Sequence, residues 1–158
     1  MRVVGVDPGL RELGYAFLEK GPTLLKTGTI YTSSELPKGD RLKLIYDRLS
    51  DEIERFNPEL LCIESVFFAK NAKSAMQVGE VRGVIALLCA QKRIEIKEIT
   101  PLELKKSLVG WGGASKEELT LALEKIYRFS PSTSHESDAI ALALCGLTIL
   151  ERRKRVLS

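Results

Sequence analysis

The order of strand and helix signals is the feature that most restricts the fold of this chain. Three strand-like segments, Arg2–Asp7, Leu13–Glu19 and Leu24–Thr32, come first and are separated by short turns, which favours an antiparallel meander. A helical pattern over Lys38–Phe56 then leads to Leu60–Glu64, a continuously apolar run typical of a strand buried on both faces. Because strand–helix–strand crossovers are right-handed, we expect this run to lie beside the first strand and parallel to it.

The second half of the chain adds one more strand and then only helices. A helix is expected over Asn71–Gln91, and the alternating apolar and charged residues of Ile94–Ile99 predict a fifth strand. The Ser/Thr-x-x-Glu pattern of a capping box begins three later helices, at Thr100, Ser115 and Thr133. We therefore expect an α/β fold with a five-stranded mixed sheet in the order 3-2-1-4-5, flanked by helices.

Size and composition fit one globular domain. The chain has 158 residues, of which 44% are hydrophobic and 28% charged, with a net charge of +3. We treat residues 1–158 as a single domain with a basic C-terminal tail from about residue 151. The helices that begin at Thr100 and Ser115 are expected to end near Gly110 and Arg128. The longest apolar run, Ala139–Leu150, is too short for a bilayer, which needs roughly 20 residues, so no membrane contact is expected. Three cysteines without a C-x-x-C pattern, and no signal-peptide pattern, indicate a reducing, cytoplasmic location.

Three carboxylates lie at the ends of the most apolar stretches. Asp7 ends the first strand, Glu64 ends the fourth, and Asp138 precedes the apolar run of the last helix. Taken singly, they could be a turn residue, a solvated strand end and a helix N-terminal charge. Because the carboxyl ends of neighbouring parallel strands meet at one sheet edge, we expect Asp7 and Glu64 to lie close together, with Asp138 facing them. Hard divalent cations prefer oxygen ligands, so the sequence predicts a metal site at this edge.

The only histidine of the chain, His135, lies three residues before Asp138 and so shares its helix face. A lone histidine is commonly a surface or core residue, but this one is a single helical turn from a predicted metal ligand. Such a cluster suits two Mg²⁺ ions roughly 3.5–4 Å apart, which activate a water and neutralise the leaving oxygen of a phosphodiester. In this arrangement Asp7 would bridge the ions, while Glu64 and Asp138 would each bind one.

An ordered set of short stretches carries a resemblance to a known family. They are Gly5–Gly9, Ile63–Asn71, Gly79–Gly83, Val109–Gly112 and His135–Ala141. Together they resemble the RuvC Holliday-junction resolvases, a branch of the ribonuclease H-like nucleotidyl transferase superfamily, and the resemblance covers nearly the whole chain. It implies a homodimeric, Mg²⁺-dependent endonuclease that nicks two opposed strands of a four-way DNA junction symmetrically. It also implies a branch-migration helicase complex as a partner.

The resemblance assigns the family's catalytic tetrad to Asp7, Glu64, His135 and Asp138. Many members have aspartate where this chain has His135. Because an imidazole is a softer ligand than a carboxylate, we expect Mn²⁺ to support cleavage at least as well as Mg²⁺. The sequence leaves open whether His135 binds metal, orients water or protonates the leaving oxygen.

Five further positions match residues that the family uses near DNA, namely Phe67, Lys70, Asn71, Lys105 and Lys116. Stacking of Phe67 on an unpaired base would be worth about 1–3 kcal/mol, whereas the alternative packs this ring under the following helix. Lysines are common on solvated faces, although residues 69–116 contain nine basic and four acidic side chains. Contacts of this kind position a protein on DNA without reading its sequence.

Two features of the sequence each allow two interpretations. The helix over Asn71–Gln91 has small residues near one side, which could form a dimer interface or allow close packing on the sheet; they are Ala75, Gly79, Gly83 and Ala86. Trp111, flanked by glycines, could be a loop tip or a core plug.

Three other functions compete with junction cleavage. A nuclease for RNA–DNA hybrids is disfavoured by the match over Phe67–Asn71, and a non-catalytic junction-binding module has no need of the carboxylate set. A sugar-kinase or actin-like ATPase also has an Asp-x-Gly turn after its first strand. That fold generally needs two such domains, and 158 residues hold one.

Overall fold

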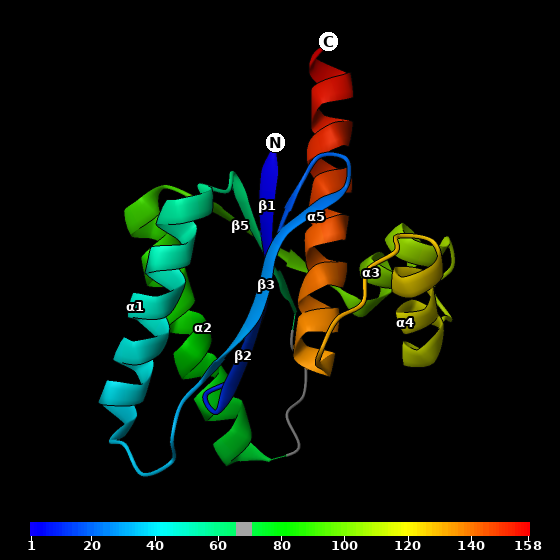
Figure 1. Cartoon of the computed structure of the whole chain (residues 1–158). Helices are drawn as coiled ribbons and strands as arrows, with labels where there is room; N and C mark the ends of the chain where they lie inside the picture. Colours follow the sequence, from blue (N-terminus) through cyan, green and yellow to red (C-terminus); the bar gives the residue numbers. More distant parts are fainter. Residues whose placement is uncertain (66–70) are drawn as a thin grey trace.

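The computed structural model describes residues 1–65 and 71–158, and its strands form one sheet in the order β3-β2-β1-β4-β5 (Figure 1). Strands β1 (Arg2–Asp7), β2 (Glu12–Glu19) and β3 (Thr23–Tyr31) form the antiparallel meander. Strand β4 (Leu60–Glu64) pairs parallel to β1, and β5 (Glu95–Ile99) pairs parallel to β4. The predicted strand order and the mixed sheet are confirmed.

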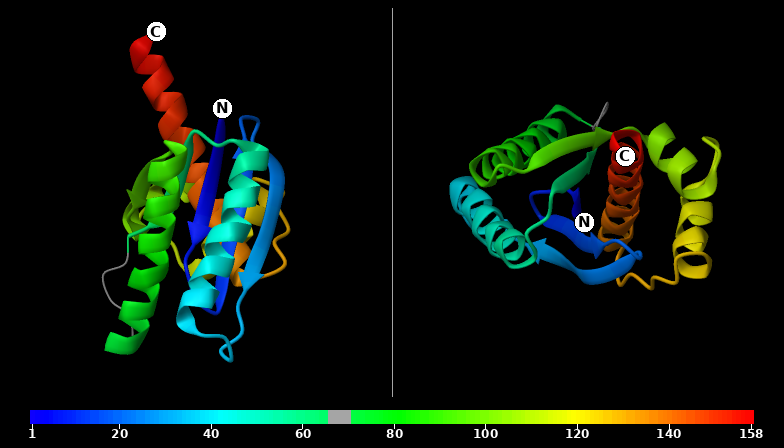
Figure 2. Two further views of the ribbon diagram at one scale, coloured as in Figure 1. Left: turned by 90° about the vertical axis from the view of Figure 1, so that its left-hand side faces the viewer. Right: turned by 90° about the horizontal axis from the view of Figure 1, so that it is seen from above.

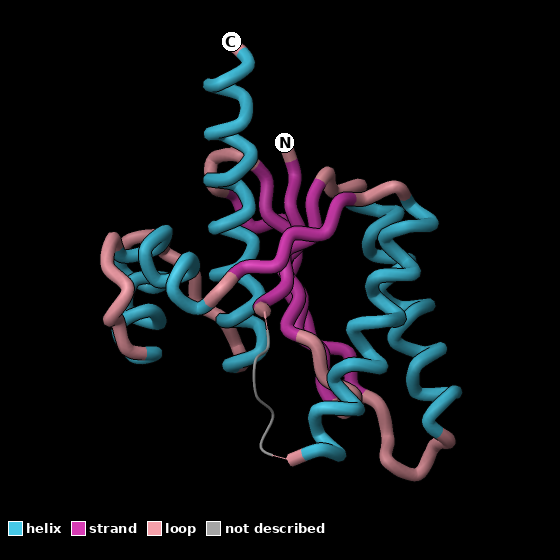
Figure 3. The backbone as a smooth tube through the Cα atoms, turned by 180° about the vertical axis from the view of Figure 1, so that it is seen from behind, coloured by secondary structure: helices cyan, strands magenta, loops and turns pink. Residues whose placement is uncertain are grey.

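Helices cover both faces of the sheet (Figure 2). Helices α1 (Lys38–Phe56) and α2 (Ala72–Lys92) lie on one face, and the long α5 (Ser134–Leu157) lies on the other. Helices α3 (Pro101–Val109) and α4 (Lys116–Lys125) flank α5 on the side away from α1 and α2, as the view from behind shows (Figure 3). None of the helices in the described ranges is both long and apolar enough to cross a membrane.

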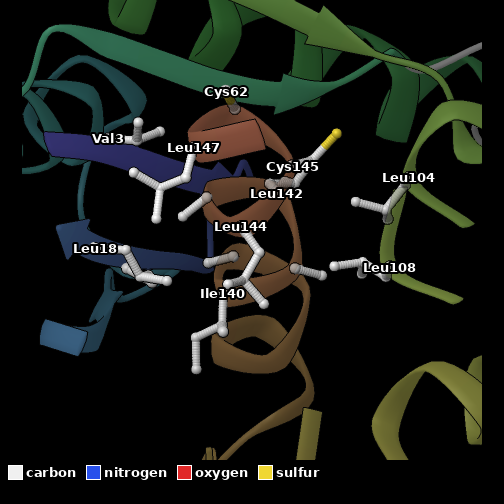
Figure 4. Close-up of a cluster of buried hydrophobic side chains, with 14 of the residues drawn as sticks. Val3, Leu18, Cys62, Leu104, Leu108, Ile140, Leu142, Leu144, Cys145 and Leu147 are labelled. Atoms are coloured by element: carbon white, nitrogen blue, oxygen red, sulfur yellow. The ribbon is translucent and has the colours of Figure 1, made fainter. Parts of the chain in front are cut away.

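Alternation of side chains along the strands divides the core into two apolar clusters. One cluster joins the sheet to α1 and α2, and its strand residues include Val4, Val6, Leu61 and Ile63. The other joins the sheet to α5 through residues such as Val3, Leu60 and Cys62. In Figure 4 the side chains of α5 lie between this face of the sheet and α3. Strand β4 contributes to both clusters, which confirms its predicted burial on both faces.

Two strand glycines allow α5 to lie directly on the sheet. A Cβ atom added to Gly5 of β1 would overlap the carbonyl oxygen of Ala139 and lie 2.7 Å from the backbone nitrogen of Ala143. A Cβ atom added to Gly14 of β2 would lie 2.5 Å from the carbonyl oxygen of His135. The backbone of α5 therefore touches β1 and β2 where these strands have no side chain.

Two predictions about helix ends need correction. The helix expected to reach about Arg128 ends at Lys125, and the chain turns through Arg128, whose φ is +60°. The backbone N–H of Phe129 then donates to the carbonyl of Leu123 (2.8 Å), which satisfies an end carbonyl. The basic C-terminal segment is also no separate tail, because it continues α5 to Leu157 beyond the sheet (Figure 1).

The small residues of α2 do not pack on the sheet. The helix turns a different set toward the core, namely Val81, Ile85, Leu88 and Cys89. A Cβ atom added to Gly79 or Gly83 would meet no heavy atom of the described residues within 4 Å, and Ala75 and Ala86 are exposed. Of the two interpretations of this stripe, close packing on the sheet is wrong.

Candidate active site

Asp7 and Glu64 end neighbouring strands at one edge of the sheet. Strands β1 and β4 run parallel with Val6 opposite Ile63, so the two carboxylate residues that follow lie at the same edge. Side chains alternate along a strand, so Asp7 shares a face with Gly5, and Glu64 shares a face with Cys62. This is the face that α5 covers, and the two carboxylates therefore lie on the side of the sheet where α5 begins.

The first turns of α5 bring two more polar side chains to this edge. Thr133 caps the helix, and its hydroxyl oxygen accepts from the backbone N–H of Glu136 (3.1 Å). In this first turn, Nδ1 of His135 lies 2.7 Å from Oδ2 of Asp7. Asp138 extends toward α4, where Nζ of Lys116 lies 3.5 Å from its Oδ2.

Glu12 is a site residue that the sequence reasoning missed. It opens β2, and its Oε2 lies 2.9 Å from Nε2 of His135. The imidazole is thus held between two carboxylates, Asp7 on one side and Glu12 on the other. Glu12 shares a strand face with Gly14, and the folded structure alone shows that His135 of α5 lies over this face, so no local sequence signal marks Glu12.

A cavity of about 250 Å³ lies beside these groups. Its lining combines both signs of charge with an apolar wall, and consists of Glu64, Pro101, Leu104, Lys105, Lys116, Leu119, Asp138 and Leu142. The two lysines come from α3 and α4, which lie beside the N-terminal half of α5 (Figure 1). The cavity therefore offers an anionic strand two cations next to two carboxylates.

The charges at the site perturb one another. Burial raises the pKa of Glu64, and the nearby charges of Asp138 and Asp7 raise it further. Burial and Asp7 likewise raise the pKa of Asp138, while Lys116 opposes this shift. Burial and neighbouring carboxylates thus disfavour the ionised form of both groups, and a bound cation would offset this effect.

The shift at His135 has opposing causes. Burial alone lowers the pKa of its imidazole, but the hydrogen bond and the negative charge of Asp7 raise it. The charges of Glu12 and Asp138 act in the same direction, and the net result is a pKa above the ordinary value. The surrounding carboxylates therefore favour the protonated form of the imidazole more than water does.

The donor chemistry of the cluster fits a hard divalent cation, because its acidic side chains, Asp7, Glu64 and Asp138, supply carboxylate oxygens. In the present side-chain arrangement, residues 1–65 and 71–158 contain no group of three His, Cys, Asp or Glu side chains close enough to hold one ion. His135 and Lys116 each occupy one carboxylate, at Asp7 and Asp138. Rotation of the His135 and Lys116 side chains would leave the Asp7 and Asp138 carboxylates able to bind a cation.

The predicted DNA-contact residues have different surroundings. Lys105 and Lys116 line the cavity next to the carboxylates. The side-chain oxygen of Asn71 caps α2 by accepting from the backbone N–H of Ser74 (2.9 Å). Phe67 and Lys70 lie outside the described residues. Trp111 is 53% exposed, so it is not a core plug.

A larger cavity, of about 470 Å³, lies farther along α5. Four basic side chains surround it, namely Lys97, Lys106, Arg152 and Arg153. Its one carboxylate is Glu103, whose Oε2 already accepts from the backbone N–H of Thr100 in the capping box of α3. This cavity therefore lacks the acidic cluster that marks the sheet edge.

Comparison with known proteins identifies the family. A sequence model described as "Crossover junction endodeoxyribonuclease RuvC" matches residues 3–146, which include the whole acidic cluster. The chain belongs to the RuvC family. Its relatives include the crossover junction endodeoxyribonucleases RuvC of Thermomicrobium roseum, 38% identical over 92% of this chain and 91% of the relative, and of Caldicellulosiruptor saccharolyticus, 40% identical over 93% and 92%.

Solved structures agree with the sequence match. RuvC of Thermus thermophilus superposes with a TM-score of 0.87 at 29% identity, covering 96% of each chain. The same protein in complex with a Holliday junction substrate gives a TM-score of 0.89 with the same identity and coverage. The fold of this chain is therefore ribonuclease H-like, as its resemblance implied.

Proposed function

We propose that this chain is a structure-selective endonuclease that resolves four-way DNA (Holliday) junctions by symmetric paired nicks, in DNA recombination and repair. The observation that carries the proposal is the family match over residues 3–146, because it spans Asp7, Glu64, His135 and Asp138. The Thermus thermophilus relative, similar over 96% of this chain, has been solved with a Holliday junction substrate, which supports the same substrate class here.

RuvC nucleases are metal-dependent, and we propose that Asp7, Glu64, Asp138 and His135 hold two Mg²⁺ ions per subunit. Bound ions would supply an activated water and neutralise the charge that develops on the leaving 3′ oxygen. The raised pKa values of Glu64 and Asp138 support this role, since a bound cation would offset both the burial of these carboxylates and the nearby negative charges. Mn²⁺ should substitute, because a nitrogen ligand suits it at least as well.

The side chains around the cavity would hold the DNA strand. Lys105 and Lys116 can bind phosphate oxygens and so fix the scissile phosphodiester beside Glu64 and Asp138. The apolar side chains of α3 and α4 that line the cavity would lie along one side of this strand. Beyond the cavity, Phe67 would stack on an unpaired base at the junction centre, with Lys70 and Asn71 near the backbone.

Two nicks on one junction require two active sites, so we propose a homodimer. The exposed stripe of α2 supports this, because its small residues leave room for a second backbone to approach. Two exposed apolar side chains of the same helix, Met76 and Leu87, are 67% and 55% exposed. Closed twofold symmetry is the most common form of such assemblies. Sedimentation of a Gly83→Glu variant should give monomers where the unaltered chain gives dimers.

The family resemblance also suggests a branch-migration helicase complex as partner. We place the protein in the cytoplasm, because its three cysteines are all buried and free, which fits a reducing compartment.

One experiment separates this function from its competitors. The protein is incubated with Mg²⁺, and in parallel with Mn²⁺, on end-labelled synthetic four-way junction, linear duplex and RNA–DNA hybrid. We expect paired symmetric nicks in the junction alone, with Mn²⁺ at least as effective as Mg²⁺. An Asp7→Asn variant should bind the junction but leave it intact, which shows that the nicks belong to this site and not to a contaminant.

Each competing function has its own result. Tight junction binding without cleavage, in either metal, would support a binding module. Cleavage of the hybrid in preference to the junction would support a different nuclease of this fold. If His135→Ala nicked junctions at the unaltered rate in both metals, His135 would have no part in catalysis.

A further inference from the structure

Arg82 of α2 contacts the backbone of Glu64 at the edge of the candidate site. Its Nη1 donates to the carbonyl oxygen of Glu64 (2.8 Å), and its Nη2 donates to the carboxylate of Glu98 on β5. We propose that Arg82 is a positioning residue, which fixes the backbone at the end of β4 and thereby the direction of the Glu64 side chain. This inference deepens the proposed function and rests on it for its biological meaning.

The end of β4 is paired on one side only. The ladder between β1 and β4 ends at Val6 and Ile63, so within the described residues Glu64 is not paired with β1. On the other side Glu64 pairs with Ile99 of β5, and the backbone N–H of Ser65 donates to the carbonyl of Ile99 (2.9 Å). The guanidinium from α2 therefore adds a contact that the sheet itself does not supply, at the last carbonyl of the strand.

The Arg82 guanidinium has a defined position. Val81, the preceding residue of α2, is fully buried in the cluster between the sheet and α1 and α2, which fixes the helix at this point. The Arg82 side chain is 21% exposed, and Glu98 accepts from its second terminal nitrogen. A planar guanidinium is pre-organised, so it loses less freedom for each hydrogen bond than a flexible lysine does. Helix α2 thus presents a rigid donor to the end of β4.

A fixed backbone at Glu64 serves the chemistry of the site. Groups that act on reacting atoms need to lie within about 0.5 Å of their productive position. The backbone dihedrals of Glu64 set the direction of its Cα–Cβ bond, so a strand end that shifts carries the carboxylate with it. A merely structural arginine would affect only stability. A positioning arginine also affects metal binding and cleavage in protein that remains folded.

Arg2 supplies a matched control, because it makes the same kind of contact at the other end of β1 from Asp7. Its Nη1 donates to the carbonyl of Phe56 at the end of α1 (3.0 Å), and its Nε donates to the carboxylate of Glu19 (3.1 Å). Arg82→Ala and Arg2→Ala each remove a guanidinium that joins a helix or strand carbonyl to a carboxylate. Thermal unfolding gives a temperature at which both variants are folded.

The first readout needs neither metal nor DNA. In EDTA, the amide hydrogen of Ser65 should exchange about tenfold faster in Arg82→Ala, because loss of a hydrogen bond from a charged donor lets the end of β4 open locally. Arg2→Ala should leave the Ser65 exchange rate unchanged. Equal acceleration in the two variants would mean that the end of β4 opens only with the whole fold, and it would overturn the proposal.

Metal affinity and cleavage supply two further readouts. Mn²⁺ affinity, measured by electron paramagnetic resonance without DNA, should fall about tenfold in Arg82→Ala, as expected when a residue that supports a metal ligand is lost. Single-turnover cleavage at saturating junction should fall by about tenfold or more, while the dissociation constant for the junction in EDTA stays the same. Arg2→Ala should change none of these values.

Two more variants complete the test. Arg82→Lys keeps the charge but loses the planar fork, so it should show the same losses to a smaller extent, also where Arg82→Ala does not fold. Glu98→Ala should weaken Mn²⁺ binding in the unaltered chain but not in an Arg82→Ala background, because Glu98 acts through Arg82.

The results that would overturn the proposal differ from those that would overturn the proposed function. Mn²⁺ affinity and cleavage that are equal in Arg82→Ala and Arg2→Ala would make Arg82 a structural residue. A change in junction affinity alone would make it a DNA contact. If the unaltered chain cut no junction, the proposed function would fail, while the exchange rates and Mn²⁺ affinities would still decide the role of Arg82.

Discussion

The two faces of the sheet are built in different ways. On the face of α1 and α2, large aliphatic side chains such as Val6 and Ile63 fill the space between sheet and helices. On the face of α5, Gly5 and Gly14 remove the spacing side chains, and the helix backbone rests on the strands. The first face is an ordinary apolar interface, while the second brings a helix unusually close.

The difference explains where the polar residues can lie. Close approach places the first turns of α5 against the ends of β1 and β2, where His135 reaches both Asp7 and Glu12. Glu64 and Asp138 complete the acidic cluster on this same face, where burial and neighbouring carboxylates raise the pKa of both. Both faces thus support the fold through an apolar cluster, and the α5 face alone also accepts unfavourable electrostatics, at the sheet edge, to build a site.

The largest expected effect comes from removing a charge on the α5 face. Asp138→Asn should reduce junction cleavage by about 10²–10³-fold, because a charge-stabilising group is lost. The same change should raise the midpoint of thermal unfolding in EDTA by about 2–4 °C, since it removes a carboxylate that burial and Asp7 disfavour. Cleavage assays and calorimetry on one preparation measure both.

Asp138→Asn should thus lower cleavage activity while it raises thermal stability. Asp47→Asn, on the outer side of α1, is the matched control and should lose no activity. A simultaneous loss of stability and cleavage in Asp138→Asn would mean that Asp138 is a structural residue.

The next effect tests the close approach itself. Gly5→Ala should destabilise the protein by about 3 kcal/mol, because the added methyl group overlaps the backbone of α5. Val6→Ala, one residue away on the other face, should cost about 2 kcal/mol through lost burial. Denaturant unfolding gives both values.

The cleavage activities of the same two variants then show which face of the sheet the active site depends on. At a temperature where both variants are folded, Gly5→Ala should cut junctions more slowly because α5 has shifted, whereas Val6→Ala should cut normally. Equal activity of the two variants would show that contact between α5 and β1 is not needed for the site.

Much of this architecture follows from local sequence patterns. Apolar runs and capping boxes are short-range signals, and they predict the sheet order and the strand ends that carry Asp7 and Glu64. The positions of His135 and Asp138 follow from the helix start at Thr133. The sequence predicts these four residues because the strand or helix that contains each one also determines its position.

Glu12 was missed because its role depends on contact between elements. A glutamate at the start of a strand looks like any solvated strand end. Only the position of α5 over Gly14 makes Glu12 a neighbour of His135, and no local pattern specifies which helix covers a strand glycine. The end of α4 at Lys125 is a similar case, since a tertiary turn through Arg128 overrides helix propensity.

A smaller effect concerns pH. The folded-state pKa of His135 lies above its ordinary value, so its contribution to stability is complete below about pH 6.5 and is lost as pH rises through the raised pKa. Because its side chain is 36% exposed, screening keeps the effect small, at about 2 °C in the unfolding midpoint. In EDTA the midpoint should fall over this range, and His135→Ala should flatten the profile while Val6→Ala keeps it. A profile unchanged by His135→Ala would mean that other groups cause it.

The smallest effect compares lysines on the two sides of the molecule. Lys116 lines the cavity beside Asp138 on the α5 side, whereas Lys43 lies on α1 and pairs with Asp47. If DNA binds over the α5 face, Lys116→Ala should reduce the slope of log affinity against log salt by about 1, because one phosphate contact and its released counterion are lost. Lys43→Ala should leave the slope unchanged. Junction binding measured in EDTA at several salt concentrations gives both slopes. Equal slopes for the two variants would place the DNA elsewhere and would remove the functional distinction between the faces.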